Sequence, residues 1–574
     1  MPLDRRSFLK LPVENPPQIA GTQLAAGSAA SPSPDSAVPA HTDPSGDFVA
    51  LDVAHTPRQR AAASPGTALG ISAGLEQHTG GLAAAEVKHA LRRSGFGAEP
   101  EQVASWSGRT AAELSQALVD AALAEPMPSA PSWSNEAVPS RGSTQEERRA
   151  YRDANNEWLL EYRMDWMDRM LTGSLRERMA LIWHNHFVTG VSGYLYAVFS
   201  YRYVQMLREH ALGNLRDFVH AVGKDPAMLI YLNGIQNRRG APNENYAREL
   251  LELFTMGPVG PDGLPNYSED DIRELARALT GWQVSARTLG PVFSEGLWDD
   301  GNKTIFGRTG AFGYDDAVAL LFEERGEAIA HFVCRHLYES LVYAEADEQV
   351  VADLAALLVA EDFELAPVVR TLISSAHFFD PAAQGAQIKS PLEHAVGMAV
   401  EIGVTPTPQT VNVLYRTARA NGQNLLDPPN VAGWPGHHDW INTTTLPYRW
   451  FVSEVFLGGR GGTDISFVPL AERITDTADP ENAFRLPLAL VEHLIPAPVD
   501  LLDIPPISDE FGGDLVTFPV PSWVNDAPAH VRDLAKMFLA GLPWYEWSPY
   551  VPGAEERMSA FVRQITQYPE FQLA

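Results

Sequence analysis

Two histidines in the segment Trp183-His-Asn-His-Phe187 are of a type that suits acid/base catalysis or metal binding. Residues two apart on an ideal helix point about 200° apart, so His184 and His186 do not easily share one metal ion. His186 falls on the apolar stripe of its segment and is expected to face the core. It is either a core histidine that hydrogen-bonds a carboxylate or a carbonyl, or a catalytic base or metal ligand.

Two glutamates in the segment 243–257 offer a pair of carboxylates. Glu249 and Glu252 are three residues apart and are expected on adjacent turns of a helix. Such a pair suits general acid/base work or a divalent metal, with His186 and Glu249 as the metal ligands if one is bound. The alternative is a solvated charged face, because Glu244, Arg248 and Glu252 form an ion-pair ladder at i, i+4 and i+8.

A segment from Asp427 to Asn442 is too rich in Pro and Gly to form a helix or a strand. It contains two Trp, two His, two Asp and two Asn, which is typical of a binding loop, and tryptophan faces suit sugars and other flat ligands. The alternative is a rigid loop whose tryptophans fill the core.

The segment Lys389-Ser-Pro-Leu-Glu393 predicts the start of a helix. Ser390 and Glu393 form a capping box, and Pro391 takes the first helical position. Lys389 then lies at the positive end of the helix dipole, which is unfavourable unless an anion or a carboxylate is near.

These segments give the candidate catalytic residues His184, His186, Glu249 and Glu252. They also give the candidate substrate-binding residues Asn243, Arg248, Lys389, Asn430, Trp434, His437, His438 and Asp439.

The elements that must position these residues are mainly α-helical. Apolar residues recur at helical spacing from about residue 82, and capping boxes are expected at Ser174-Leu-Arg-Glu177 and at Ser268-Glu-Asp-Asp271. Short strands are expected only within 282–313, so the fold class is a multi-helix globular domain with short β elements and long loops. Helices are expected over 82–91, 110–124, 146–171, 174–186, 327–341, 346–361, 364–376, 528–540 and 553–567.

The composition is that of a core-forming globular chain. Its 574 residues are 45% apolar and carry a formal charge of −29, which argues against nucleic acid and anionic lipid as partners. The single cysteine, Cys334, can form neither an internal disulfide nor a cysteine-based zinc site. No stretch is apolar for long enough to predict a transmembrane helix, so no integral membrane segment is expected.

The N-terminus resembles a twin-arginine export signal at Arg5-Arg-Ser-Phe-Leu-Lys10, although Glu14 and prolines interrupt the apolar region that should follow. This predicts a signal over 1–30 and a Ser/Pro/Ala-rich disordered tail over 31–80. A helical core domain is expected over 82–455, and an acidic, Pro-rich segment with C-terminal helices over 456–574. The expected location is periplasmic or secreted, with the cytoplasm as the alternative.

Several segments together resemble the bacterial "domain of unknown function 1800" family. The resemblance implies a helical fold, often with a twin-arginine signal, and a phosphatase- or sulfatase-like protein encoded nearby, but no established activity. The chain departs from the family pattern at Phe254 and Asp299, where histidine is common. The matching segments are Trp183–Phe187, 243–253, 267–270, 276–282, 303–307, 389–393, 428–435 and 568–572.

The function expected from these features is an exported hydrolase-type enzyme that acts on an extracytoplasmic polymer or glycan. Its cofactor is not determined, and a divalent metal is one option. The alternative is a non-catalytic scaffold or maturation partner of the phosphatase- or sulfatase-like neighbour, in which the same motifs are buried structural networks.

Overall fold

The computed structural model describes residues 69–140, 142–459, 465–474, 480–497, 499, 502 and 528–574. All of them belong to one compact unit. The expected export signal over 1–30 and most of the expected tail over 31–80 lie outside the described residues. The end of that predicted tail is attached to the core, because Gln77 forms a β-bridge with Ser375.

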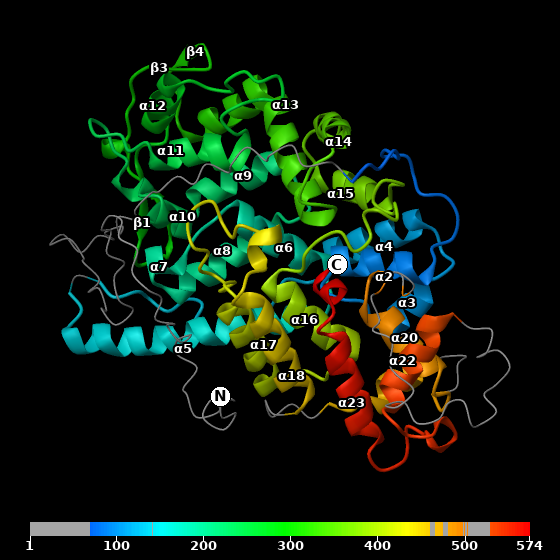
Figure 1. Ribbon diagram of the computed structural model, residues 1–574. Helices are drawn as coiled ribbons and strands as arrows, with labels where there is room; N and C mark the ends of the chain where they lie inside the picture. The colour runs from blue at the N-terminus through cyan, green and yellow to red at the C-terminus, as the bar shows by residue number, and fades with distance from the viewer. Residues whose placement is uncertain are drawn as a thin grey trace, which may run out of the picture. The chain divides into compact units, whose positions relative to one another are not determined.

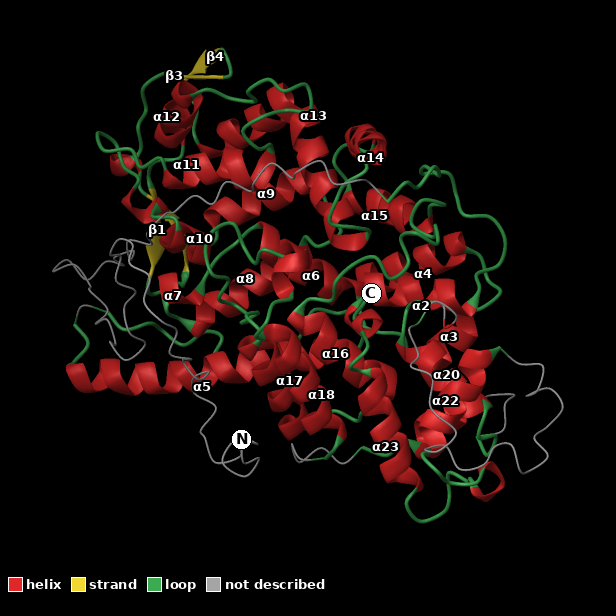
Figure 2. Ribbon diagram, viewed as in Figure 1, coloured by secondary structure: helices red, strands yellow, loops and turns green. Residues whose placement is uncertain are grey.

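The described chain is mainly helical, which confirms the predicted fold class (Figure 2). The predicted capping box at Ser268 and Asp271 is present. Thr110 and Thr144 also cap helices, since both accept a hydrogen bond from the backbone N–H three residues later. The first half of the fold contains α2 (Ala84–Ser94), α3 (Pro100–Trp106), α4 (Ala111–Ala124), α5 (Gln145–Met170), α6 (Leu175–His186), α7 (Val191–Tyr194), α8 (Ala197–Glu209), α9 (Leu215–Lys224), α10 (Pro226–Tyr231) and η1 (Gly234–Gln236).

The second half begins with a helix that changes type. α11 (Asn245–Glu249) continues directly into the π-helical turn η2 (Leu250–Thr255). The remaining helices are α12 (Glu269–Ala278), η3 (Glu295–Leu297), α13 (Tyr314–Leu341), α14 (Glu348–Ala360), α15 (Leu365–Ser374), α16 (Pro391–Ile402), α17 (Pro408–Ala420), η4 (His437–Trp440), α18 (Thr445–Leu457), α19 (Val468–Ile474), α20 (Arg485–Leu494), α22 (Ala529–Leu539), η6 (Trp544–Glu546), α23 (Ala554–Ile565) and η7 (Pro569–Gln572).

The strands of the described residues form two small antiparallel hairpins in the predicted region. β1 (Trp282–Ser285) pairs with β2 (Gly290–Phe293), with Trp282 opposite Phe293. β3 (Lys303–Ile305) pairs with β4 (Arg308–Gly310) and packs against α12. The sequence therefore located the β structure correctly.

Helices from both ends of the described chain pack together. α2 and α3 lie beside α20 and α22, and α23 lies beside α18 (Figure 1). Arg92 of α2 bonds Glu401 of α16 at 2.5 Å and the carbonyl of His493 in α20 at 2.6 Å. One continuous apolar core runs from Leu82 to Phe571, so the N- and C-terminal helices share it.

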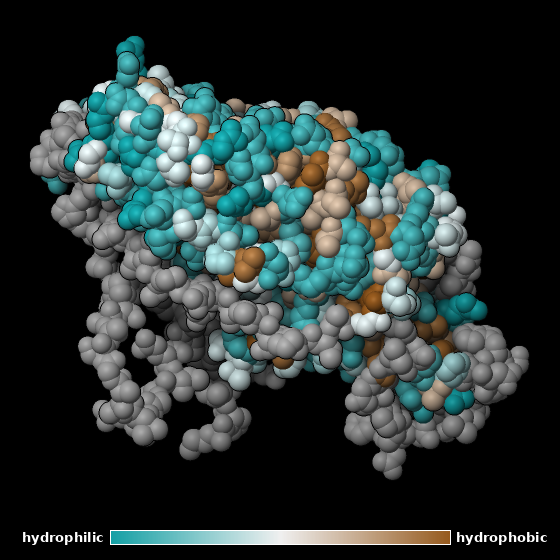
Figure 3. Space-filling view, turned by 90° about the horizontal axis from the view of Figure 1, so that it is seen from above, coloured by the Kyte–Doolittle hydropathy of each residue, from teal (hydrophilic) through white to brown (hydrophobic). Residues whose placement is uncertain are grey.

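The face in Figure 3 is mostly hydrophilic, with apolar residues exposed only in small areas. This agrees with the acidic composition of the chain. Among the described residues, no helix is both long enough and apolar enough to cross a membrane.

The helix start at Ser174 differs from the prediction. Ser174 does cap α6, by accepting a hydrogen bond from the N–H of Arg176, but Glu177 does not complete a capping box. The Glu177 carboxylate instead accepts two hydrogen bonds from Arg208 of α8, at 2.8 and 2.9 Å, and both side chains are buried. A buried guanidinium requires a counter-charge, and this requirement outweighs a local cap.

We expect Glu177→Ala to lower the free energy of unfolding by about 3–5 kcal/mol, because it leaves Arg208 buried without a carboxylate. Urea denaturation of the full chain measures this loss. Glu161→Ala, an exposed site on α5, is the control and should change stability by less than about 0.5 kcal/mol. Equal effects of the two substitutions would contradict the structural role of the pair.

Candidate functional site

The two histidines at the end of α6 enter different surroundings, as the helical spacing predicted. The His184 ring stacks on Trp434 with 5.4 Å between ring centres and meets the edge of Trp166. Burial lowers the pKa of His184 to about 3, so this ring is neutral. Nε2 of His186 donates a hydrogen bond to the carbonyl of Phe254, 2.9 Å away.

His186 thus connects α6 to the π-helical turn η2. Its ring also lies 4.6 Å from the ring of His336 on α13. The carbonyl of Phe254 is free to accept because the last carbonyls of a helix have no partner within it. The prediction that His186 faces the core is confirmed, since the side chain is buried.

Asn185, between the two histidines, attaches the loop 427–442 to α6. Its Oδ1 accepts a hydrogen bond from the N–H of Trp434 at 2.7 Å. Gly433 makes this approach possible: its φ is +83°, and a Cβ there would lie 2.4 Å from Asn185 Oδ1. The sequence identified both segments, but not the contact that joins them.

The tryptophans of this loop are buried. Trp434 is 4% exposed and Trp440 is 7% exposed, so little of either ring is open to a ligand. Asn430 is half-buried, and its side chain accepts a hydrogen bond from the N–H of Ala432. The exposed candidates are His438 and Asp439.

His437 occupies an unusual position in the loop. It has a positive φ of 45° and packs between Tyr343 and His438, with ring centres 5.3 and 4.1 Å away. Burial, together with the charge of His438, lowers the pKa of His437 to about 4. A strained residue in a loop with exposed polar neighbours is a feature that recurs at binding sites.

Several polar residues of the segment 243–257 bond neighbouring parts of the fold. Asn243 Oδ1 accepts a hydrogen bond from the N–H of Asn245 at the start of α11. Arg248 donates to both carboxylate oxygens of Glu269, at 3.1 and 2.8 Å, and to Glu244 at 3.3 Å. The Glu244–Arg248 step of the predicted ladder is therefore present, and Arg248 also joins α11 to α12.

Glu249 lies where the α-helix becomes a π-helix, and it is 8% exposed. Burial and then the charge of Glu252 raise the pKa of Glu249 to about 7, while Arg248 opposes the shift. A carboxyl with this pKa exchanges protons near neutral pH. π-Helical turns are frequent at functional sites.

Tyrosines surround the two glutamates. Burial first, and then the charges of Glu252 and Glu249, raise the pKa of Tyr267. Burial also raises the pKa of Tyr231, with further contributions from the charges of Asp427 and Glu249. Tyr231 therefore lies within electrostatic reach of both Glu249 and Asp427, the first residue of the loop 427–442.

Sequence reasoning missed Tyr231 and Asp427 as members of this site. Asp427 Oδ1 accepts a hydrogen bond from the N–H of Ser192, which follows α6, so the loop is attached there as well. Tyr231 carries no motif and ends a short apolar helix. Only its packing against Gly193, where a Cβ would lie 2.6 Å from the ring, shows that it belongs here.

Lys389 lies apart from the glutamate pair in a separate cluster. Its Nζ donates to the carbonyl of Phe571 at 3.0 Å and lies 4.5 Å from the centre of that ring. Burial lowers the pKa of Lys389 to about 8. The capping box of Ser390 and Glu393 is confirmed.

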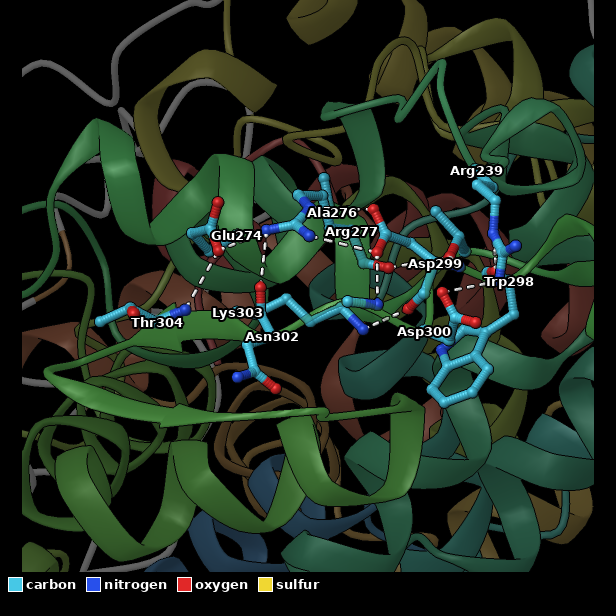
Figure 4. A network of polar contacts seen from close by, with 12 residues as sticks. Arg239, Glu274, Ala276, Arg277, Trp298, Asp299, Asp300, Asn302, Lys303 and Thr304 are labelled. Carbon is cyan, nitrogen blue, oxygen red and sulfur yellow. Dashed lines mark hydrogen bonds and ion pairs between the residues drawn. The ribbon is translucent and has the colours of Figure 1, made fainter.

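The family departure at Asp299 has a structural explanation (Figure 4). Arg277 lies between Glu274 and Asp299 and donates to both oxygens of Asp299, at 2.9 and 3.1 Å. Lys303 donates to the carbonyl of Asp299, and its Nζ lies 4.9 Å from the ring centre of Trp298. Asp299 therefore holds the hairpin β3–β4 to α12. The other departure, Phe254, has a fully buried ring that packs on Phe187.

The described residues contain no group of three or more His, Cys, Asp and Glu placed to hold a metal ion. Two hollows of about 640 and 500 Å³ are present, and neither is lined by a candidate residue. The larger is lined by Ser268, Asp270, Asp271, Arg273, Glu274, Thr304, Phe306, Gly307 and Arg325.

The contact between Asn185 and Gly433 predicts that alanine substitutions at two glycines of the same loop differ in their effect on stability. Gly433 and Gly436 have φ values of +83° and +78°, but a Cβ on Gly436 would meet nothing within 4 Å. We expect Gly436→Ala to cost about 1–3 kcal/mol of stability from the backbone alone, because its φ of 78° and ψ of 174° lie in a region essentially restricted to glycine. Gly433→Ala should cost about 1–3 kcal/mol more, because it displaces Asn185. Urea denaturation compares the two variants, and equal losses would show that the loop is not held by this contact.

The match to known families covers most of the chain. Residues 89–573 match the family described as "Protein of unknown function (DUF1800)". Neither the curated proteins nor the solved structures gave a match. The matched range contains every segment on which the family resemblance rests, from Trp183-His-Asn-His-Phe187 to the C-terminal segment around Phe571. The chain therefore belongs to the DUF1800 family.

Proposed function

We propose that the protein is a hydrolase-type enzyme in which Glu249 and Glu252 act as an acid/base pair. The observation that carries this proposal is the pKa of Glu249, which burial and the neighbouring charge of Glu252 raise to about 7. Perturbed carboxyls of this kind cluster at catalytic sites because a general acid works best when its pKa is near the working pH.

The two carboxyls then have different roles. Glu249, which is protonated in part of the population near neutral pH, donates a proton to the leaving-group oxygen. Glu252 is half-buried and acts on Glu249 as a negative charge, so it is the group that accepts a proton from the attacking water. Paired carboxyls with these roles are the usual machinery of glycoside hydrolysis, which fits a glycan or another extracytoplasmic polymer as substrate.

Substrate contacts are assigned to the exposed end of the loop 427–442. His438 and Asp439 are exposed, and His437 lies against them. Tyr231, which responds to the charges of both Asp427 and Glu249, supports a neighbourhood shared by the loop and the acid/base pair. Asn430 and Arg248 have partners within the fold and are assigned to positioning.

A divalent metal ion, if one is bound, would be held by His186 and Glu249. In the described structure His186 uses Nε2 as a donor to the carbonyl of Phe254. A stoichiometric divalent metal in the native protein that disappears in His186→Ala would make the proposed enzyme metal-dependent.

We also propose that the protein is exported. The twin-arginine-like residues Arg5 and Arg6 favour a periplasmic or secreted protein. Cell fractionation of the full chain, with Arg5→Lys/Arg6→Lys as the control, tests this location.

A second candidate function is that of a non-catalytic scaffold or maturation partner of a phosphatase- or sulfatase-like protein. The specific observation in its favour is that His184, His186 and Trp434 are buried and contact one another or the helices around them. Under this hypothesis the exposed residues His438 and Asp439 belong to an interface. If the protein co-purifies with the phosphatase- or sulfatase-like protein and Glu249→Gln leaves its function unchanged, the scaffold or maturation partner is favoured over the enzyme.

Glu249→Gln tests the enzyme directly, since glutamine keeps the shape of the protonated acid but cannot transfer its proton. We expect release of reducing ends from a panel of aryl glycosides and bacterial polysaccharides to fall by about 10²–10⁴-fold. Glu161→Gln, on the exposed face of α5, should keep full activity. Full activity in a folded Glu249→Gln protein would refute the assignment.

We expect Glu249→Gln also to change the pH dependence of stability. The folded pKa of Glu249, about 7, lies above the ordinary glutamate pKa of 4.5, so the folded state binds more protons between these values. Wild-type stability should therefore fall as the pH rises from 4.5 to about 7, by up to about 3 kcal/mol from this group. Glu249→Gln should lose this contribution, so its stability relative to wild type should increase over that range. Urea denaturation at pH 5 and pH 8 measures the difference, and parallel pH profiles would contradict the shifted pKa.

A further inference from the structure

A buried arginine at the junction of α18 with the C-terminal segment lacks a counter-charge. Arg449 is 0% exposed, and its Nη1 donates to Oε1 of Gln572 across 3.4 Å. Its Nε and Nη2 are buried and have no hydrogen-bond partner. These two N–H groups form the side of the guanidinium that binds a carboxylate or phosphate through two parallel hydrogen bonds.

A second buried donor lies in the same cluster. His394 of α16 is 1% exposed, its Nε2 has no hydrogen-bond partner, and its ring meets the edge of Phe571 at 5.7 Å between ring centres. Lys389 contacts the other side of the same segment through the carbonyl and the ring of Phe571. The positive charges of Arg449 and Lys389 both act on His394, which shows that the three groups share one region.

The carboxylates of this region bond other arginines. Glu393 bonds Arg178 at 2.5 Å and accepts the N–H of Ser390. Glu401 bonds Arg92 at 2.5 Å through Oε1, and its Oε2 is buried without a hydrogen-bond partner. No ion pair within 4.0 Å joins either glutamate to Arg449 or Lys389 in the described part of the structure.

Two buried cations that lack a direct ion pair are costly. Removing an unpaired charge from water costs several kcal/mol, and proteins avoid this by pairing the charge or binding a counter-ion. The chain as a whole is strongly acidic, so an excess of positive charge at this position is a local feature. Burial lowers the pKa of Arg449 to about 10 and that of Lys389 to about 8, although the charge of Glu393 opposes the shift at both groups and that of Glu401 opposes it at Lys389.

We propose that Arg449 and His394, supported by Lys389, form a buried site for one small tetrahedral oxyanion of the phosphate or sulfate class. The Nε and Nη2 groups of Arg449 bind two oxygens, Nε2 of neutral His394 donates to a third, and Lys389 supplies charge. The anion joins α16, α18 and the C-terminal segment 568–574, and it is independent of the acid/base pair at Glu249.

The test uses the full chain purified in phosphate- and sulfate-free buffer. We expect inorganic phosphate or sulfate, but not chloride at equal ionic strength, to raise the thermal midpoint in a saturable way, by about 2 °C or more. Arg449→Met should lose this response, whereas Arg416→Met, an exposed arginine on α17, should keep it. A difference between the phosphate and sulfate curves identifies the preferred anion.

A second measurement keeps the proposal testable if Arg449→Met does not fold. Wild-type protein purified in phosphate and then dialysed is unfolded in guanidinium chloride, and the released anions are counted by ion chromatography. About one oxyanion per chain, or a saturable rise in the midpoint that is weakened in His394→Phe or Arg449→Lys, supports the site. No released oxyanion together with no anion-specific rise overturns it, and so does an undiminished response in a folded Arg449→Met protein.

Discussion

The fold depends on the pairing of charged side chains that are buried between helices. Arg208 and Glu177 join α8 to α6, Arg178 and Glu393 join α6 to α16, and Arg92 and Glu401 join α2 to α16. In each case the partners are distant in sequence, and each guanidinium requires a carboxylate once it leaves water. These pairs determine which helices become neighbours within the continuous apolar core.

The same constraint gives two buried carboxyls opposite pKa shifts. Glu393 and Glu249 are both buried glutamates on helices. Arg178 and Arg93 outweigh the effect of burial on Glu393 and lower its pKa to about 2, so it remains ionised. Glu249 has Glu252 as a close charge instead, and its pKa rises to about 7. The sign of the neighbouring charge therefore decides the direction in which the pKa of a buried carboxyl shifts.

The motif segments of the family meet through backbone contacts as well as side chains. Asn185 holds the loop at Trp434, and His186 holds the π-helical turn at Phe254. These contacts explain why two histidines, an asparagine and a tryptophan lie in a mainly buried region. They position the loop and the turn that carry the more exposed candidates, His438 and Glu252.

The sequence by itself determined the helical class, the positions of most helices, the region of the two hairpins and the burial of His186. These features follow from local periodicity and capping, which act over a few residues. The tertiary structure alone decided the partners of the charged residues. Glu177 pairs with Arg208 and does not form its expected capping box, and Lys389 donates to the carbonyl of Phe571. Tyr231 joins the site without any motif. Such partners come from segments tens to hundreds of residues apart, and only packing brings them within the few ångströms over which hydrogen bonds and charges act.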